Sequence, residues 1–517
     1  MKHSKKLASL LLALVMVLSL AVTAFADEST TYSITINNST AGHTYEAYQI
    51  FTGDLATNEA GNKVLSNIVW GSGVSEAGQT ALGDAATKTE TLKTEADAKA
   101  FAKAVAPYLT TAAGSANTVT DGKYVISGLA AGYYLVKDQD GSLIGDNDSY
   151  TEYIIQVVGN VTATPKSDVP EVQKKVKYIN DSTDTTKTDW QDSADYDIGD
   201  SIPFQLKATL ADNVSSYTTY KVVFHDTLSK GLTYNKDAKV YIDGTETNGF
   251  TVTATVNADG TTTLTVSCDD VKALGAGNSS VITVEYTAKL NENAVLGSAG
   301  NPNEVYLEYS NNPNKSENGN NETGETPKDV VIVFTYKTII NKVDSETKPL
   351  TGAAFKLEKL IKGEDGAADA WTTIKEFAVD GTTTSFTFSG LDDGQYKLTE
   401  TKTPVGYNTI DPIYFVIEAT HGETADVPTL KTLNAYLTDA NGNKQTEMKD
   451  GESVNIDLGT VDLTAGSITT TVVNKSGSEL PSTGGIGTTI FYVLGGVLVL
   501  AAVVLLVTKK RMSGAEK

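Results

Sequence analysis

Ser389-Gly390-Leu391-Asp392-Asp393-Gly394-Gln395-Tyr396, in the last third of the chain, has a counterpart in the first third, Ser127-Gly128-Leu129-Ala130-Ala131-Gly132-Tyr133-Tyr134. Both stretches contain the pattern Ser-Gly-Leu-x-x-Gly-x-Tyr. Extending the same register pairs Glu400 with Asp138. We therefore predict that the first and last domains of this protein share a fold.

The residues around the repeat predict strands rather than helices. Short runs of Val, Ile, Thr and Tyr alternate with period two and are interrupted by Asn, Gly and Asp, as in 32–36 and 469–473. One stretch, 96–109, instead has its apolar side chains at helical spacing. The predicted fold class is all-β, a series of immunoglobulin-like β-sandwich domains.

The length of the chain sets the number of domains. Residues 27–483, about 457 in number, are enough for roughly three domains. The predicted segments, in chain order, are 1–26, then domains over 27–166, 167–328 and 329–478, then 479–517.

The first 26 residues have the features of a secretory signal peptide. Three lysines precede an apolar core at 7–22, and Ala24-Phe25-Ala26 offers small residues at a cleavage site. We predict cleavage between Ala26 and Asp27.

The last forty residues combine three signals. They begin with the pentapeptide Leu480-Pro481-Ser482-Thr483-Gly484 and contain a basic cluster, Lys509-Lys510-Arg511, before a short polar tail. The apolar run between them, 490–507, is long enough with its approach to cross a hydrocarbon core of ~30 Å as a helix. The basic cluster marks the cytoplasmic side of this predicted transmembrane span.

Charge and cysteine content exclude several classes of function. Seven of the 41 lysines and arginines and one of the 64 acids lie in the terminal signals, which leaves 34 against 63, a net charge near −29. Such a surface argues against nucleic acid or anionic lipid as a partner. Cys268 is the single cysteine, so no disulfide framework exists despite the predicted export. With four histidines and no catalytic constellation, we expect no metal, no cofactor and no enzyme activity.

The C-terminal signals resemble the cell-wall sorting signal of Gram-positive surface proteins. The resemblance implies cleavage by a sortase between Thr483 and Gly484, and transfer of the new Thr483 carboxyl group to an amine. The membrane helix is then a temporary retainer of the precursor.

Further motifs resemble the major (backbone) subunit of sortase-assembled pili. Glu400 within Tyr-x-Leu-x-Glu-Thr-x-x-Pro-x-Gly-Tyr matches the E box of that family. Lys342 in Lys-Val-Asp, followed by Gly-Ala-x-Phe at 352–355, is similar to the opening of a collagen-adhesin B-type domain. Thr164-Pro165-Lys166 resembles the pilin motif, although the family has an aromatic residue where Thr164 stands.

This resemblance implies a structural polymer subunit on the cell wall. Its implied partners are other copies of the chain, with Lys166 as the acceptor of Thr483, pilus-specific and housekeeping sortases, minor pilins and peptidoglycan. The alternative is a monomeric wall-anchored adhesin that binds a host matrix protein. It needs the sorting signal but not Lys166.

Lys342, Glu400 and Asn474 form a candidate cross-link in the third domain. Burial favours a neutral lysine amine and a protonated glutamic acid. The acid can then polarise the asparagine carboxamide, so that the lysine forms an amide with loss of ammonia. This reaction occurs once, during folding.

In the second domain we predict Lys174, Asp226 and Asn303 for the same roles. Lys174 alternates with two valines and is preferred to Lys175. Asp226 resembles the acid of collagen-adhesin A-type domains. Asn303 is preferred to Asn311, and both stay open. The first domain has no lysine within 32–38 to face Asp138, so we expect no such bond there.

Overall fold

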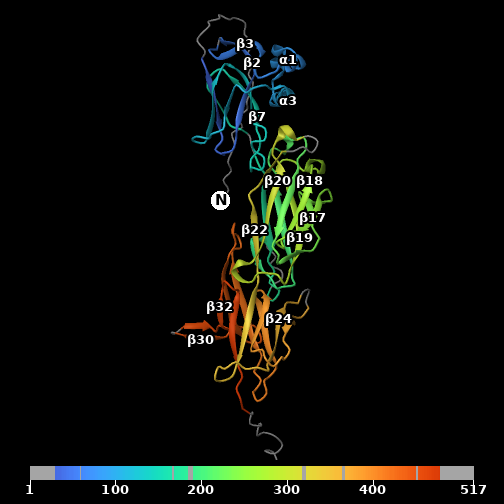
Figure 1. The fold of residues 1–517 in the computed structure, drawn as a ribbon, viewed down its shortest axis with the longest axis vertical. Helices are drawn as coiled ribbons and strands as arrows, with labels where there is room; N and C mark the ends of the chain where they lie inside the picture. Colours follow the sequence, from blue (N-terminus) through green and yellow to red (C-terminus); the bar gives the residue numbers. More distant parts are fainter. Residues whose placement is uncertain are drawn as a thin grey trace, which may run out of the picture.

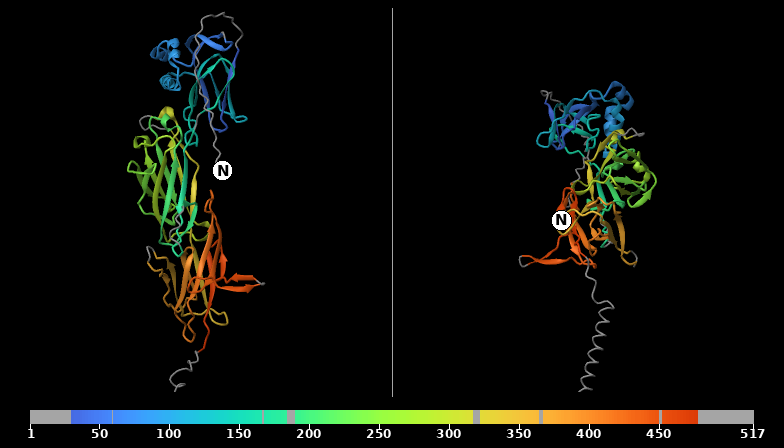
Figure 2. Two further views of the ribbon diagram at one scale, coloured as in Figure 1. Left: turned by 180° about the vertical axis from the view of Figure 1, so that it is seen from behind. Right: turned by 60° about the horizontal axis from the view of Figure 1, so that its bottom comes forward.

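The computed structural model describes residues 30–477, apart from 59, 166–167, 184–189, 317–321, 364–366 and 450–451. The chain forms three β-rich domains arranged end to end along a rod (Figures 1 and 2). In this part of the chain no helix is long and apolar enough to span a membrane. The predicted span at 490–507 and the signal peptide lie outside the described residues.

The first domain is a sandwich of two sheets with a helical insertion. One sheet has the order β5-β1-β8 and the other β3-β2-β6-β7, with β4 on β2. The strands are β1 (Tyr32–Asn37), β2 (Tyr45–Thr57), β3 (Lys63–Trp70), β4 (Gly114–Ala116), β5 (Lys123–Leu129), β6 (Gly132–Asp138), β7 (Glu152–Val157) and β8 (Val161–Ala163). The helices are α1 (Glu76–Leu82), α2 (Ala85–Thr91), α3 (Glu95–Val105) and the 3-10 turn η1 (Ala106–Tyr108).

Helix α3 confirms the helix predicted over 96–109 but is shorter. It begins with a capping box, in which Thr94 Oγ1 accepts from Asp97 N (3.1 Å) and Asp97 Oδ2 accepts from Thr94 N (2.9 Å). Phe101 packs on Phe51 of β2 with ring centroids 5.4 Å apart. The α-helix ends at Val105 because Pro107, in the first turn of η1, has no N–H to continue it.

The second domain packs two seven-stranded sheets face to face. Their orders are β10-β9-β12-β19-β15-β16, with β14 on β19, and β11-β22-β20-β13-β18-β17, with β21 on β20. The strands are β9 (Glu171–Lys177), β10 (Trp190–Gln191), β11 (Ser193–Asp195), β12 (Ser201–Thr209), β13 (Val222–Leu228), β14 (Leu232–Tyr234), β15 (Lys239–Ile242), β16 (Thr245–Thr247), β17 (Thr251–Val256), β18 (Thr262–Cys268), β19 (Val281–Leu290), β20 (Asn301–Ser310), β21 (Thr323–Glu325) and β22 (Asp329–Phe334). The 3-10 turns are η2 (Val214–Ser216), η3 (Val271–Leu274), η4 (Gly297–Ala299) and η5 (Pro313–Lys315).

The third domain has sheets of order β26-β23-β33-β32 and β25-β24-β27-β28-β29. The strands are β23 (Tyr336–Val343), β24 (Ala354–Ile361), β25 (Ala370–Glu376), β26 (Ser385–Leu391), β27 (Gly394–Lys402), β28 (Ile413–His421), β29 (Leu430–Thr438), β30 (Thr446–Lys449), β31 (Glu452–Asn455), β32 (Thr460–Asp462) and β33 (Ser467–Val473). The hairpin β30–β31 projects sideways from this domain (Figure 1).

The first and third domains have the same strand topology, which confirms the prediction from the repeat. β1 pairs antiparallel with β5 and parallel with β8, and β23 pairs in the same way with β26 and β33. In the opposite sheets, β6 lies between β2 and β7, as β27 lies between β24 and β28.

The boundary between the second and third domains differs from the predicted one at 328–329. The sequence over 330–343 has the pattern of one long strand, but the structure divides it at Thr335. β22 pairs with β20 and β11 of the second domain, whereas β23 starts the third. The continuous β-branched sequence conceals this change of sheet, because buried strands in adjacent domains have the same composition.

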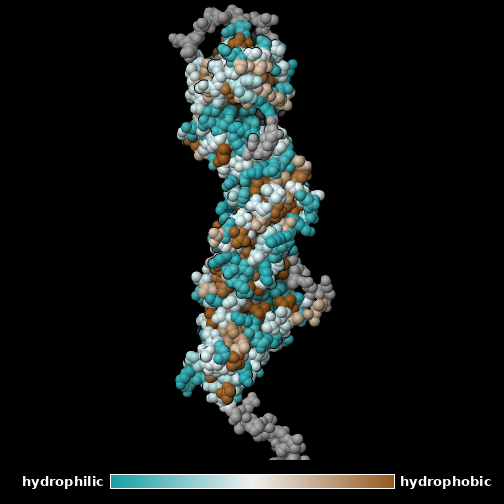
Figure 3. Space-filling view, turned by 45° about the vertical axis from the view of Figure 1, so that its right-hand side comes forward, coloured by the Kyte–Doolittle hydropathy of each residue, from teal (hydrophilic) through white to brown (hydrophobic). Residues whose placement is uncertain are grey.

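Both joints between domains have direct contacts. At the first joint the β6–β7 loop meets the second domain, where Gly145 N donates to Thr323 O (2.9 Å) and Tyr150 N to Asn311 O (2.8 Å). At the second joint a Cβ on Gly297 would lie 2.4 Å from the backbone N of Gly466, so glycine is required for this approach. The face shown in Figure 3 is largely hydrophilic along the rod, with scattered apolar side chains.

Candidate functional site

The three residues predicted to cross-link the third domain lie together between its sheets. Lys342, on β23, is in register with Val472 of β33, and Asn474 follows β33. Glu400 lies on β27 of the opposite sheet. The exposed fractions of Lys342, Glu400 and Asn474 are 0, 5 and 0%. An amide between Lys342 and Asn474 would therefore tie the first strand of the domain to its last.

Hydrogen bonds orient the carboxamide on Glu400. Asn474 Nδ2 donates to Glu400 Oε2 (3.0 Å) and to Asn408 O (2.5 Å). Lys342 Nζ donates to the carbonyls of Val472 (3.0 Å) and Val343 (3.3 Å), and no ion pair between described residues includes it. Burial lowers the pKa of Lys342, and the nearby Glu400 only partly opposes this effect. The amine is therefore shifted toward its neutral, nucleophilic form.

Two oxygens in this cluster are buried without a hydrogen-bond partner among the described residues. They are Glu400 Oε1 and Asn474 Oδ1. Both accept hydrogen bonds when the glutamate is ionised, and an unpaired buried acceptor costs about 1–3 kcal/mol. A proton on Glu400 would convert one acceptor into a donor.

The second domain brings together Lys174, Asp226 and Asn303, all fully buried. Lys174 lies on β9 of one sheet, whereas Asp226 and Asn303 lie on β13 and β20 of the other. Lys174 Nζ lies 2.5 Å from Asp226 Oδ1. Burial lowers the pKa of Lys174 and raises the pKa of Asp226, although their attraction opposes both shifts. Both groups are therefore shifted toward their neutral forms.

Tyr286 is a fourth member of this cluster that the sequence analysis missed. Its hydroxyl group donates to Asp226 Oδ2 (2.5 Å) and accepts from Asn303 Nδ2 (2.7 Å) and Lys174 Nζ (3.2 Å). It thus connects the acid to the carboxamide. The sequence signal for Tyr286 is only its place in the alternating strand β19, which many core tyrosines share.

The alternative residues lie elsewhere. Lys175 faces away from the core and forms an ion pair with Asp192. Asn311 is buried at the first joint, where its Nδ2 donates to Leu143 O (2.8 Å). His225, next to Asp226, faces the other side of the sheet and pairs with Glu308 (3.0 Å).

In the first domain a histidine takes the place of the lysine. Asp138, the counterpart of Glu400, accepts from His43 Nδ1 (2.7 Å), and His43 Nε2 lies 2.9 Å from Asp148 Oδ2. Because both ring nitrogens face carboxylates, the imidazole is held in its protonated form. Burial alone would lower the pKa of His43, but the bonds to Asp138 and Asp148 raise it to about 9.

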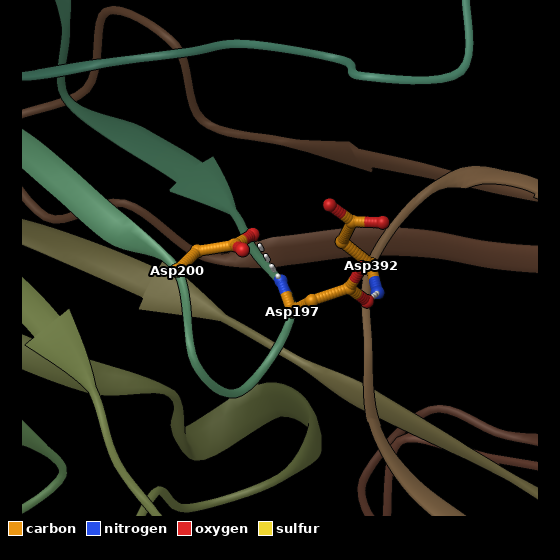
Figure 4. Close-up of side chains that lie close together, drawn as sticks. All are labelled: Asp197, Asp200 and Asp392. Atoms are coloured by element: carbon orange, nitrogen blue, oxygen red, sulfur yellow. Dashed lines mark hydrogen bonds between the residues drawn. The ribbon is translucent and has the colours of Figure 1, made fainter. Parts of the chain in front are cut away.

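A further buried cluster lies at the second joint, around Lys359. Its Nζ lies 2.6 Å from Asp181 Oδ1 and 2.8 Å from Asp197 Oδ2, and it also pairs with Asp392. Figure 4 shows Asp197 and Asp200 on one turn of the second domain, facing Asp392 of the third. Burial raises the pKa of Asp200 to about 6, and the pKa of Asp392 well above its usual range. Lys359 is the positive charge in this group of acids.

The other predicted site residues lie outside the described part of the chain. They are Lys166, the signal cleavage site Ala26–Asp27 and the motif residues Leu480, Pro481, Ser482, Thr483 and Gly484. The residues that flank Lys166, Pro165 and Asp168, belong to the connection between the first two domains. Asp168 Oδ2 accepts from Asp212 N of the second domain (2.6 Å).

Three protein families match separate segments of the chain. The Gram-positive pilin backbone subunit 2, Cna-B-like domain, matches residues 198–313, and a prealbumin-like fold domain matches 337–432. The LPXTG cell wall anchor motif matches 472–513. The last match covers the predicted sorting signal.

The chain is also similar to known surface proteins. It is 27% identical over 453 residues to the trypsin-resistant surface T6 protein of Streptococcus pyogenes serotype M6. This alignment covers 76% of this chain and 77% of the T6 protein. The solved T6 backbone pilin of that organism covers 88% of this chain and all of its own, with a TM-score of 0.55 and 19% identity. The structure of the full-length major pilin SpaD of Corynebacterium diphtheriae is similar with a TM-score of 0.49 and 18% identity. The match covers 88% of this chain and 100% of SpaD.

Proposed function

Since the chain is a backbone pilin of the Gram-positive type, a cell-wall-anchored subunit of a sortase-polymerised pilus, we propose that Thr483 of one copy is joined to Lys166 of the next. The anchor motif over 472–513 is the observation that carries this proposal. A sortase cleaves after Thr483, and the lysine amine takes the new carboxyl group.

The positions of the two ends support a fibre rather than a closed ring. The described chain ends at Gly477, at the end of the third domain that is distant from the second (Figure 1). Lys166 belongs to the connection between the first two domains. A head-to-tail contact between such different surfaces is heterologous, and it builds an open polymer when the rotation between successive copies does not close a ring.

The partners follow from this reaction. A pilus-specific sortase joins the copies, a housekeeping sortase attaches the finished fibre to peptidoglycan, and minor pilins occupy its other positions. The fibre supports adhesion, and the chain acts as a structural subunit rather than an enzyme. No comparison favours a monomeric adhesin.

We propose that the third domain closes itself with an amide between Lys342 and Asn474. The neutral amine attacks Cγ of Asn474 while protonated Glu400 hydrogen-bonds the carboxamide oxygen. The Nζ–Cγ bond forms, the Cγ–Nδ2 bond breaks, and Nδ2 leaves as ammonia with the proton that the amine loses. The two unpartnered oxygens of the cluster, the Oε1 of Glu400 and the Oδ1 of Asn474, support this arrangement.

The second domain would form the same bond from Lys174 to Asn303, with Asp226 as the acid. Tyr286 holds the carboxamide through its hydroxyl group and links it to the acid. Lys174 is favoured over Lys175 by its burial, and Asn303 over Asn311 by its contact with Tyr286.

The substitution Lys166→Ala tests the polymer linkage. In cells that carry the pilus and housekeeping sortases, the variant should be secreted, folded and attached to the wall as a monomer, because only the acceptor amine is lost. Boiled wall extracts on a denaturing gel should lose the ladder of multimers that the wild type shows.

Lys177→Ala, on strand β9 of the second domain, is the matched control and should keep the ladder. A ladder that persists in Lys166→Ala would show that another lysine accepts Thr483. Absence of any ladder in the wild type would contradict head-to-tail polymerisation.

A further inference from the structure

A turn at the outer end of the third domain presents an apolar side chain to solvent. Tyr407 N donates to Pro404 O (3.2 Å), and Gly406 has the positive φ of 88° that this turn requires. Val405, at the second position of the turn, is 98% exposed. This fraction is the highest among the exposed large apolar side chains of the described residues.

This turn is fixed to the segment that leads to the sorting motif. Tyr407 forms a β-bridge with Ser476, and Asn408 N donates to Lys475 O (3.0 Å). Six residues lie between Ser476 and Thr483, so the seven Cα–Cα steps span at most roughly 25 Å. Wherever Thr483 is bonded, the turn must therefore lie within that distance.

The acceptor end also exposes an apolar side chain. The β6–β7 loop lies at the joint between the first two domains, and Lys166 lies between those two domains in the sequence. Leu143, in this loop, is buried at 1% exposure and contacts Asn311, but the adjacent Ile144 is 61% exposed.

We propose that the turn at 404–407 of one copy docks on the first joint of the next copy, with Val405 against the surface that includes Ile144. This inference rests on the proposed linkage of Thr483 to Lys166. The occupant is a second copy of this chain because the connection from Ser476 holds the turn within roughly 25 Å of the copy to which Thr483 is bonded.

The contact is too small to form a stable interface between subunits. We therefore expect it to affect the rate at which Thr483 is joined to the lysine. Burial of one valine side chain favours the docked arrangement by roughly tenfold or more. Docking holds the Thr483 end near the acceptor lysine, which raises the rate of bond formation.

The substitution Val405→Asp tests the contact. The full chain is expressed with its sortases, and growth of the ladder is followed after a pulse of synthesis. We expect Val405→Asp to slow the appearance of multimers about tenfold, whereas Val405→Leu keeps the wild-type rate. Loss of ammonia in the third domain, measured by intact mass, should be unchanged in both variants because the turn lies at the surface.

Val427→Asp is the matched control. Val427 is 70% exposed but lies in the loop 422–429, at the opposite end of the domain, where Glu423 O accepts from Asp192 N. Equal rates for Val405→Asp and Val427→Asp would overturn the docking proposal and leave the linkage standing. If Lys166→Ala also kept its ladder, the linkage itself would be wrong, and the docking proposal with it.

Discussion

The number of carboxylates around a buried lysine decides its chemistry. Among the described residues, Lys174, Lys342 and Lys359 have no exposed surface. Burial lowers the pKa of the first two. Burial also disfavours the charge of Lys359, but three carboxylates outweigh it and raise its pKa well above the usual value. Lys359 therefore stays an ammonium ion that holds two domains together, whereas the other two lysines can act as nucleophiles.

The intact mass of the folded protein tests this distinction. Each proposed amide removes one ammonia, so the mature chain should weigh about 34 Da less than its sequence, about 17 Da for each bond. Glu400→Ala should restore one of these increments and sensitise the third domain to trypsin, since a tie across more than a hundred residues stabilises by up to ~5 kcal/mol.

Lys359→Arg is the control, and it should keep both ammonia losses. Combining Glu400→Ala with Lys342→Ala should add little, because both disable the same bond. A wild-type mass equal to that of the uncrosslinked sequence would rule out both amides.

The sequence allowed part of each cluster to be predicted. Lys342 and Glu400 belong to motifs, and Lys174 follows from alternation with valines. Tyr286 and His43 could not be found in this way. Each acts through a partner more than fifty residues distant, and neither has a local pattern that distinguishes it from an ordinary core residue.

At the scale of elements, strand type was predictable and strand partners were not. The repeat predicted the shared topology of the first and third domains because its glycines and tyrosines recur in one register. The division of 330–343 between β22 and β23 depends on which sheet each half joins. That choice is made by tertiary packing, and the local sequence is equally suited to both sheets.

The acidic residue at the same strand position faces different side chains in the first and third domains. At the end of β27 the acid faces a lysine and an asparagine, whereas at the end of β6 it faces His43. His43 comes from the segment before β2, so the absence of a lysine in β1 did not reveal it. The first domain is therefore closed by an ion triad where the third has candidate cross-link residues.

This triad makes the first domain sensitive to pH. The pKa of His43 is raised from 6.5 to about 9 by Asp138 and Asp148 against the effect of burial, so the folded state holds its proton more tightly than the unfolded state. The stability from this group is fully present below pH 6.5 and is lost as the pH rises through 9. Hydrogen exchange of the amides of β6 and β7 should therefore accelerate between pH 6.5 and 9, after correction for the intrinsic rate.

His43→Gln should remove this dependence and leave exchange in the second and third domains unchanged. An equal pH dependence in His43→Gln would show that another group is responsible.

At the scale of the whole molecule, the proposed bonds define the path of tension through a pilus. In the proposed linkage, force enters a subunit at Lys166 and leaves at Thr483, so residues before Lys166 carry none of it. The amide from Lys174 to Asn303 bypasses the chain between them, and the amide from Lys342 to Asn474 does the same in the third domain. A first domain without a covalent tie is consistent with this path.

Three stretches of the path have no covalent bypass, 166–174, 303–342 and 474–483, and the longest of them runs from Asn303 to Lys342. It contains most of β20, all of β21 and β22 and most of β23, and it crosses the second joint, where the ion pairs of Lys359 connect the domains. These 39 residues are held only by strand pairing and side-chain contacts, so they are the part of the subunit that can extend first.

Single-molecule pulling on polymerised subunits tests this path. The wild type should extend by no more than roughly 190 Å for each subunit, the contour length of the three stretches without a bypass, because the rest of both sandwiches is bypassed. Glu400→Ala should allow up to roughly 450 Å more, since the 132 residues from Lys342 to Asn474 then carry force. His43→Gln should leave the extension unchanged, because the first domain lies outside the path. Steps of the length expected for 30–165 in the wild type would mean that tension passes through the first domain, and would place the acceptor lysine before it.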